Sequence, residues 1–161
     1  MKPAPYAAAM DTIAFRRARV ADLPAIIALL ADDPLGRERE DVSLPPVPAY
    51  GAAFAAIDSD PNQLLAVVTQ DDEVIGTLQI TFIPGLSRQG GLRGQIEGVR
   101  IAADRRGSGL GHRVFDWAIE ACRSRGCSLV QLTTDRGRSD AHRFYEQLGF
   151  TASHFGYKKT L

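Results

Sequence analysis

The chain reads VRIAADRRGSGLGH from Val99 to His112, where an apolar, strand-like segment leads through paired arginines and three alternating glycines into an amphipathic helix. Glycines allow a backbone to pass close to a ligand, and the free N–H groups at a helix start point toward that ligand. The helix dipole adds roughly half a positive charge at the same end. This segment therefore predicts a cradle for a phosphate or pyrophosphate.

Known anion-binding loops differ in the spacing of their glycines. A dinucleotide fingerprint, Gly-x-Gly-x-x-Gly, that begins at Gly107 needs a third glycine where this chain has His112. A Walker loop ends in Gly-Lys-Ser/Thr, and this segment has no lysine. This chain has the pattern Arg106-x-x-Gly109-x-Gly111 instead. Its glycine spacing therefore matches neither of the two nucleotide-binding motifs.

The composition is that of an ordinary globular domain. The 161 residues are 45% hydrophobic and 24% charged, a length that suits one domain with a sizeable core. Because 19 basic residues balance 19 acidic ones, no overall field favours nucleic acid or an anionic membrane. No apolar run reaches the length of a membrane span, and residues 1–11 lack a signal-peptide pattern. We expect a cytoplasmic protein whose residues 1–11 form a flexible extension.

Cysteine and histidine usage does not indicate a metal. The spacing of Cys122 and Cys127 matches no redox or zinc motif, and the three histidines are scattered. We expect buried, reduced thiols and no metal, with a nucleophilic cysteine as the weaker alternative.

Strand and helix patterns follow one another along the whole chain. Strands are expected at 12–18, 63–69, 74–83, 95–101 and 128–134, and two short ones within 150–160; helices are expected at 22–30, 49–57, 109–125 and 140–148. No repeat or linker interrupts this order. It predicts one α/β domain around a mostly antiparallel sheet.

Two segments resemble one known family. Residues 96–111 are similar to the segment that carries the Arg/Gln-x-x-Gly-x-Gly/Ala signature of the GNAT superfamily of acyl-CoA N-acyltransferases. Residues 140–150, DAHRFYEQLGF, are similar to its Ala-x-x-Phe-Tyr-x-x-x-Gly-Phe motif and follow in the same order. The resemblance covers roughly residue 12 to the C-terminus. It implies a single domain over 1–161, with a mixed, mostly antiparallel seven-stranded sheet, about four flanking helices, and a splay between strands 4 and 5.

The resemblance implies acetyl-CoA as cosubstrate. The backbone of Val99 and Ile101 would pair with the pantetheine amides, and an N–H of Val99 or Arg100 would polarise the thioester carbonyl. Arg138 stands where the family often has an asparagine that contacts the cofactor arm, so it either reaches a phosphate or is a solvated arginine. The cofactor-binding residues implied are Val99, Arg100, Ile101, Arg106, Gly107, Ser108, Gly109, Leu110, Gly111, His112, Arg138 and Phe144.

The resemblance also implies the catalytic pair Tyr145 and Glu97. Tyr145 is the candidate acid for the leaving sulfur; because a phenol near pKa 10 is a weaker acid than a thiol near 8.5, full transfer is uphill by roughly 2 kcal/mol. Glu97 is the candidate base, and strand alternation places it on the face of Val99 and Ile101 unless a bulge shifts the phase. The alternative for Glu97 is an ion pair with Arg93 or Arg100. The alternative for Tyr145 is packing beside Phe144.

The acceptor amine is expected between residues 32–48 and 83–94. The acidic residues Asp32, Asp33, Glu38, Glu40 and Asp41 suit a cationic amine, and Arg88 and Arg93 suit a carboxylate, which together favour a small zwitterion. Protein N-termini or lysines, and an acyl-CoA-binding regulatory module without transfer, stay as alternatives. Exposed late strands around residues 155–159 suggest a homodimer.

Overall fold

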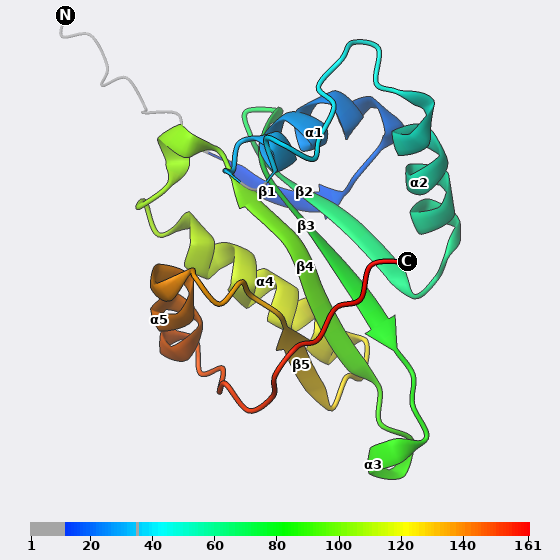
Figure 1. Cartoon of the computed structure of the whole chain (residues 1–161), viewed down its shortest axis with the longest axis vertical. Coiled ribbons are helices and arrows are strands. Elements are labelled where there is room, and N and C mark those ends of the chain that lie inside the picture. The colour runs from blue at the N-terminus through cyan, green and yellow to red at the C-terminus, as the bar shows by residue number, and fades with distance from the viewer. Residues whose placement is uncertain (1–11, 35) are drawn as a thin grey trace, which may run out of the picture.

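Five strands form one sheet in the order β1-β2-β3-β4-β5 (Figure 1). The structure, a computed structural model, describes residues 12–34 and 36–161, so the expectation for residues 1–11 lies outside it. Neighbouring strands run antiparallel except β4 and β5, which are parallel. The strands are β1 (Ile13–Arg17), β2 (Gln63–Gln70), β3 (Glu73–Ile83), β4 (Arg93–Ile101) and β5 (Leu129–Leu132).

Helices cover both faces of this sheet. The two early helices pack on one face, and α4 packs on the other. The helices are α1 (Leu23–Ala31), α2 (Pro48–Ser59), the four-residue α3 (Ser87–Gly90) in the β3–β4 connection, α4 (Leu110–Ser124) and α5 (Ser139–Gln147); single 3-10 turns stand at Val20–Asp22 and Ala103–Arg105.

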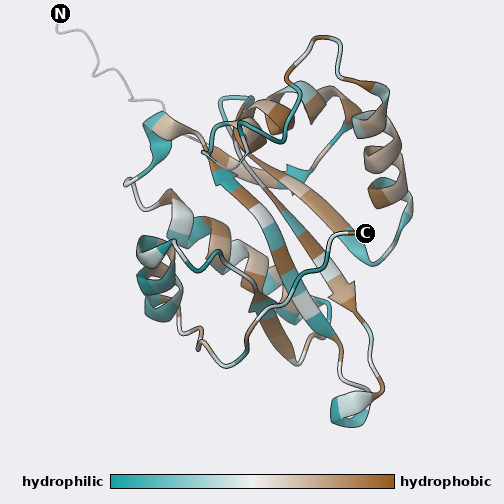
Figure 2. Ribbon diagram, in the orientation of Figure 1, coloured by the Kyte–Doolittle hydropathy of each residue, from teal (hydrophilic) through white to brown (hydrophobic). Residues whose placement is uncertain are grey.

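The strand β2 shows why both faces are buried. Ala66 and Val68 pack into the part of the core that α4 completes, whereas Val67 packs against Ile26 of α1 on the opposite face. Side chains of a strand alternate between faces, so a strand covered on both sides is apolar at nearly every position. Figure 2 shows this apolar run along β2, alternating polar and apolar residues along β4, and a largely polar α5.

The helix α4 begins and ends as its sequence indicates. Its buried side chains recur at helical spacing and face the sheet: Leu110, Val114, Phe115, Ala118 and Cys122. Gly126 follows the helix at φ +85°, a left-handed conformation that glycine adopts without strain. On the sheet side, a Cβ at Gly94 of β4 would collide with the Cys122 sulfur, so the two elements approach closely.

The expected sixth and seventh strands are not confirmed. Residues 148–161 are described but form no strand, and residues 151–161 are all exposed. Phe155 and Tyr157 keep 83% and 93% of their surface open to solvent. A strand pattern needs a sheet edge to supply its hydrogen bonds, and in this structure no edge of the same chain takes up these residues.

Candidate functional site

The loop between β4 and α4 has the backbone that its glycines predict. Gly107 has φ +76° and Gly109 has φ +84°, both left-handed. Within the part of the chain that the structure describes, no backbone carbonyl accepts from the N–H groups of Gly107, Ser108 or Gly109. The next three N–H groups belong to the first turn of α4 and have no acceptor inside the helix. Six consecutive donors at a helix N-terminus suit a pyrophosphate.

The strands β4 and β5 separate next to this loop. They pair only from Arg93 to Ile96 on β4 and from Leu129 to Leu132 on β5. Beyond Ile96 the remaining residues of β4 have no partner strand on that side, because β5 ends at Leu132. On that side the backbone groups of β4 beyond Ile96 therefore have no strand to pair with.

A β-bulge in β4 changes the orientation of Glu97. Glu97 is opposite Gln79 and Arg100 is opposite Thr77, so Gly98 and Val99 together oppose a single residue of β3. Gly98 takes φ +59° at this bulge. Because residues 77 and 79 point to one face, Glu97 shares its face with Arg100 and not with Val99 and Ile101. The expectation from simple alternation is therefore wrong, since the bulge inserts one extra residue.

Glu97 is exposed and forms none of the ion pairs found in the described part of the chain. The alternative in which it pairs with Arg93 or Arg100 is not seen. Arg100 instead donates to Asp33 at 3.3 Å and to the Val99 carbonyl at 2.9 Å. The Glu97 carboxylate therefore has no cationic partner among the described residues.

Tyr145 lies on α5 in a cluster of aromatic rings. Its ring centroid is 5.5 Å from Phe115, 5.7 Å from Phe144 and 6.2 Å from Phe150. Burial raises the pKa of the Tyr145 hydroxyl above its usual value, and the positive charges of Arg138 and Arg100 oppose that rise. The phenol is therefore neutral near neutral pH and able to donate a proton.

Phe144 joins α5 to the glycine-rich start of α4. Its ring is 5.0 Å from His112 in an edge-on arrangement. A Cβ at Gly111 would lie 3.3 Å from the Phe144 Cζ atom, so the third glycine of the motif is needed for helix packing. Ser108, predicted at the same loop, donates its hydroxyl to the Arg105 carbonyl at 2.7 Å.

The predicted arginines have different surroundings. Arg106 donates through Nε to the Ile101 carbonyl and through Nη2 to Asp32. Arg138 precedes α5 and is exposed, with its charge near Tyr145. The Ile101 and Val99 carbonyls, which the resemblance assigns to pantetheine, thus each accept a hydrogen bond from an arginine side chain.

Most of the expected acceptor-side carboxylates already have partners. Asp32 and Asp33 bind Arg106 and Arg100. Glu40 accepts from the Tyr50 hydroxyl at 2.7 Å, and Asp41 accepts from the Ser43 backbone at 2.9 Å. These pairings reduce the negative charge that a cationic amine would meet there.

A row of uncharged polar side chains, which the sequence motifs did not indicate, lies on the face of the sheet that carries Glu97. Gln79 donates to the Gln63 side chain at 2.9 Å, Thr81 donates to the same oxygen at 3.0 Å, and Gln131 donates to Gln95 at 2.6 Å. The register places all of them on the face of Glu97. Polar residues at every second position of otherwise apolar strands could have indicated this row.

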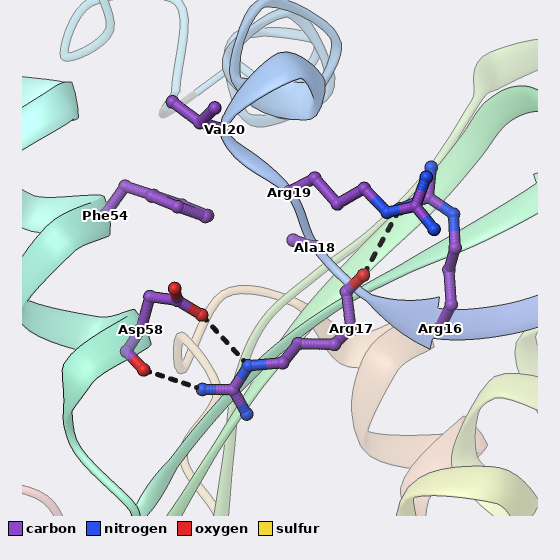
Figure 3. A pocket seen from close by; sticks show the side chains of 7 residues that line it. All are labelled: Arg16, Arg17, Ala18, Arg19, Val20, Phe54 and Asp58. Atoms are coloured by element: carbon purple, nitrogen blue, oxygen red, sulfur yellow. Dashed lines mark hydrogen bonds and ion pairs between the residues drawn. The ribbon is translucent and has the colours of Figure 1, made fainter.

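A cavity of about 540 Å³ lies elsewhere, between β1 and α2 (Figure 3). Arg17 crosses it to donate to Asp58 at 3.0 Å. The cavity contains none of the predicted site residues; its lining is Arg16, Arg17, Ala18, Arg19, Val20, Phe54 and Asp58. The candidate site is therefore the β4–β5 gap and not this cavity.

Neither a metal-binding cluster nor a membrane-spanning helix occurs among the described residues. Over residues 12–34 and 36–161, no group of three or more His, Cys, Asp and Glu side chains is arranged to hold a metal. Over the same residues, no helix combines the length and the apolar character needed to cross a membrane.

Three comparisons with known proteins agree with the geometry. The chain is 30% identical over 152 residues to an aminoalkylphosphonate N-acetyltransferase of Salmonella typhimurium, covering 94% of each. It is similar to a solved structure from Bacillus halodurans C-125, named a transcriptional regulator, with 47% identity and a TM-score of 0.90 over 93% of this chain and 100% of the other. A structure from Agrobacterium tumefaciens C58, described as an acetyltransferase, has 29% identity and a TM-score of 0.81 over 92% and 99%.

The match to a family model covers most of the chain. The model of the acetyltransferase (GNAT) family matches residues 24–150, which include the splayed strands, the glycine loop and α5. The chain therefore belongs to the GNAT family of acetyltransferases and is an acyl-CoA-dependent N-acetyltransferase.

Proposed function

We propose that this enzyme transfers an acetyl group from acetyl-CoA to the primary amine of a small molecule by direct attack in a ternary complex. The observation that carries the proposal is the gap beside β4. At one end of it lie six N–H groups without an acceptor, Glu97 lies on β4 where pairing with β5 ends, and Tyr145 of α5 is near enough to Arg100 of β4 for that charge to affect its pKa.

The glycine loop suits the pyrophosphate of the cosubstrate. The N–H groups from Gly107 to His112 would donate to phosphate oxygens, with Arg106 as an additional cation. Bound acetyl-CoA supplies an activated thioester carbonyl for the amine. A backbone N–H of Val99 or Arg100, next to the bulge, would donate to the oxyanion that develops there.

Two side chains would move protons. Glu97 would accept the proton that the acceptor nitrogen loses, directly or through a water, so that a neutral amine attacks the thioester and the C–N bond forms as the C–S bond breaks. Tyr145 would donate a hydrogen bond to the departing sulfur, one that strengthens as negative charge builds there. Each such group typically contributes about 10²- to 10⁴-fold to the rate.

An amine that also carries an anionic group is the acceptor we favour, either an amino-acid-like metabolite or an aminoalkylphosphonate. The name of the Salmonella relative supports the second. Arg100 lies on the face of Glu97, so this face presents a base for the amine and, once the acceptor's anion displaces Asp33, a cation for that anion. The hydrogen-bonding row of glutamines on the same face suits a polar acceptor.

The experiment is to follow release of the coenzyme A thiol from acetyl-CoA across a panel of aminoalkylphosphonates, amino acids, polyamines, aminoglycosides and peptides. We expect turnover with one class that carries both an amine and an anion, and a fall of about 10²-fold or more in Glu97→Gln. The control is Asp58→Asn, which also replaces a carboxylate by an amide but is remote from Glu97. Coenzyme A binding without turnover on any acceptor would favour a regulatory module, which the name of the Bacillus halodurans relative makes a concrete alternative.

We also propose a homodimer formed through the C-terminal segment. Phe155 and Tyr157 are two residues apart, as on one face of a strand, and both are almost fully exposed. Within the described sheet, β5 is the last strand and has one open edge. Pairing of residues 150–160 with a second copy would bury both. Sedimentation at micromolar concentration should give a dimer, and a monomer would contradict this.

A further inference from the structure

Two adjacent carboxylates at the end of α1 hold the two arginines of the cofactor segment. Asp32 accepts from Arg106 Nη2 at 2.8 Å, and Asp33 accepts from Arg100 Nη2 at 3.3 Å. These contacts span 74 and 67 residues of sequence. They join the end of α1 to the strand and loop on which we place acetyl-CoA.

The Arg106 contact occupies much of that guanidinium. Nε donates to the Ile101 carbonyl at 3.0 Å, and Nη2 donates to both the carbonyl and the carboxylate of Asp32. The carbonyl of Asp32 also lies just beyond the last turn of α1, where the helix dipole attracts cations. In this structure the arginine of the glycine motif is therefore engaged with α1 and not free to meet a phosphate.

The two ion pairs differ in how accessible they are. The side chains of Arg106 and Asp32 are 50% and 46% exposed, whereas those of Arg100 and Asp33 are 24% and 14% exposed. Exposed pairs contribute little net stability, and an arginine binds phosphate through charge-assisted hydrogen bonds that are stronger. A pyrophosphate would thus displace Asp32 readily, while Asp33 and Arg100 would stay paired.

We propose that Asp32 is an internal competitor of the cosubstrate pyrophosphate for Arg106 and so lowers the affinity for coenzyme A. This inference rests on the cofactor position given under Proposed function. When coenzyme A binds, the Arg106 guanidinium moves from Asp32 to the pyrophosphate. This frees the end of α1, where residues 32–48, expected beside the acceptor, begin. By thermodynamic linkage, any ligand that frees Asp32 from Arg106 also strengthens coenzyme A binding.

The test measures binding and needs no turnover. The Kd values of coenzyme A and of pantetheine, which lacks the pyrophosphate, are determined by calorimetry for wild type and Asp32→Asn. Asn keeps the shape of the side chain and removes the charge. Asp58→Asn is the matched control, because its pair with Arg17 at 3.0 Å is similarly exposed and lies outside the site. We expect Asp32→Asn to bind coenzyme A about two- to fivefold more tightly, as removal of an exposed ion pair allows. Its affinity for pantetheine should not change.

A double-mutant cycle links the effect to Arg106. Arg106→Gln should weaken coenzyme A binding, and Asp32→Asn should have no further effect in that background. An equal or higher Kd of coenzyme A in Asp32→Asn would overturn the inference and leave the proposed function standing. A wild-type protein that binds no coenzyme A would overturn both.

Discussion

Replacing Tyr145 by Phe separates the chemistry of this residue from its packing. The ring lies 5.5 Å from Phe115 and 6.2 Å from Phe150, contacts that a phenylalanine keeps. The hydrogen bonds found on α5 involve other side chains and not the Tyr145 hydroxyl. We therefore expect the free energy of unfolding to change by less than about 0.5 kcal/mol.

The rate should change far more. Proton transfer from a phenol near pKa 10 to a thiolate of a thiol near 8.5 is uphill by about 2 kcal/mol. Burial of Tyr145 raises its pKa and adds to this cost, while Arg138 and Arg100 reduce it. A hydrogen bond that strengthens during reaction fits these energies better than complete transfer. The expected loss is thus near the lower end for an acid, about 10²-fold in kcat or ~2.7 kcal/mol.

The assay is thiol release from acetyl-CoA at saturating acceptor, with kcat and KM determined separately for wild type and Tyr145→Phe. KM for acetyl-CoA should stay within a few-fold. Because burial raises the pKa of Tyr145 above its ordinary value, the phenol stays mostly protonated between pH 7 and 9, so the ratio of the two kcat values should be nearly constant over this range. A variant with unchanged kcat, or one whose melting temperature falls with its activity, would refute the reasoning.

Three further predictions concern stability and thiol chemistry. Asp22→Asn should lower the free energy of unfolding by about 1–3 kcal/mol at pH 7, because a mostly buried carboxylate that accepts from Arg16 at 2.7 and 2.9 Å is lost. Arg16 lowers the pKa of Asp22 below its ordinary 3.8. The stabilisation by the ion pair is therefore fully present above pH 3.8 and is lost as the pH falls through the lowered pKa. Denaturant titrations of wild type and Asp22→Asn should thus converge at acid pH. Gly94→Ala should cost about 1–3 kcal/mol in the same titration because its Cβ collides with the Cys122 sulfur, and unchanged stability would contradict the close approach of β4 and α4. Burial raises the pKa of Cys122 to about 12, so alkylating reagents at pH 8 should leave it unmodified until the protein unfolds, as mass spectrometry would show.

Local signals along the chain were sufficient for most of the fold. The apolar period of α4, its closing Gly126 and the apolar runs of β2 and β3 placed these elements within a few residues of their observed bounds. The glycine-rich segment after β4 predicted a loop that leads into a helix; both are present, and the structure adds that Gly107 and Gly109 are left-handed. Such patterns depend on neighbours in sequence, so they can be read without a tertiary structure.

The C-terminal residues show where such patterns fail. Alternation at Phe155 and Tyr157 predicts strands, but a strand forms only beside an edge that supplies its hydrogen bonds. No edge within this structure takes them up. An alternating sequence pattern does not show whether the fold provides a neighbouring strand.

The sequence by itself determined the family, the position of the glycine-rich loop before α4 and which residues are the candidate acid and base. Only the tertiary structure decided which way Glu97 faces, because one extra residue in the β4 bulge reverses the alternation. Only the tertiary structure also showed that Asp32 and Asp33 hold Arg106 and Arg100 across about seventy residues of chain. Charges on a surface loop carry no local signal of their partners, since an ion pair depends on where the fold brings the two side chains.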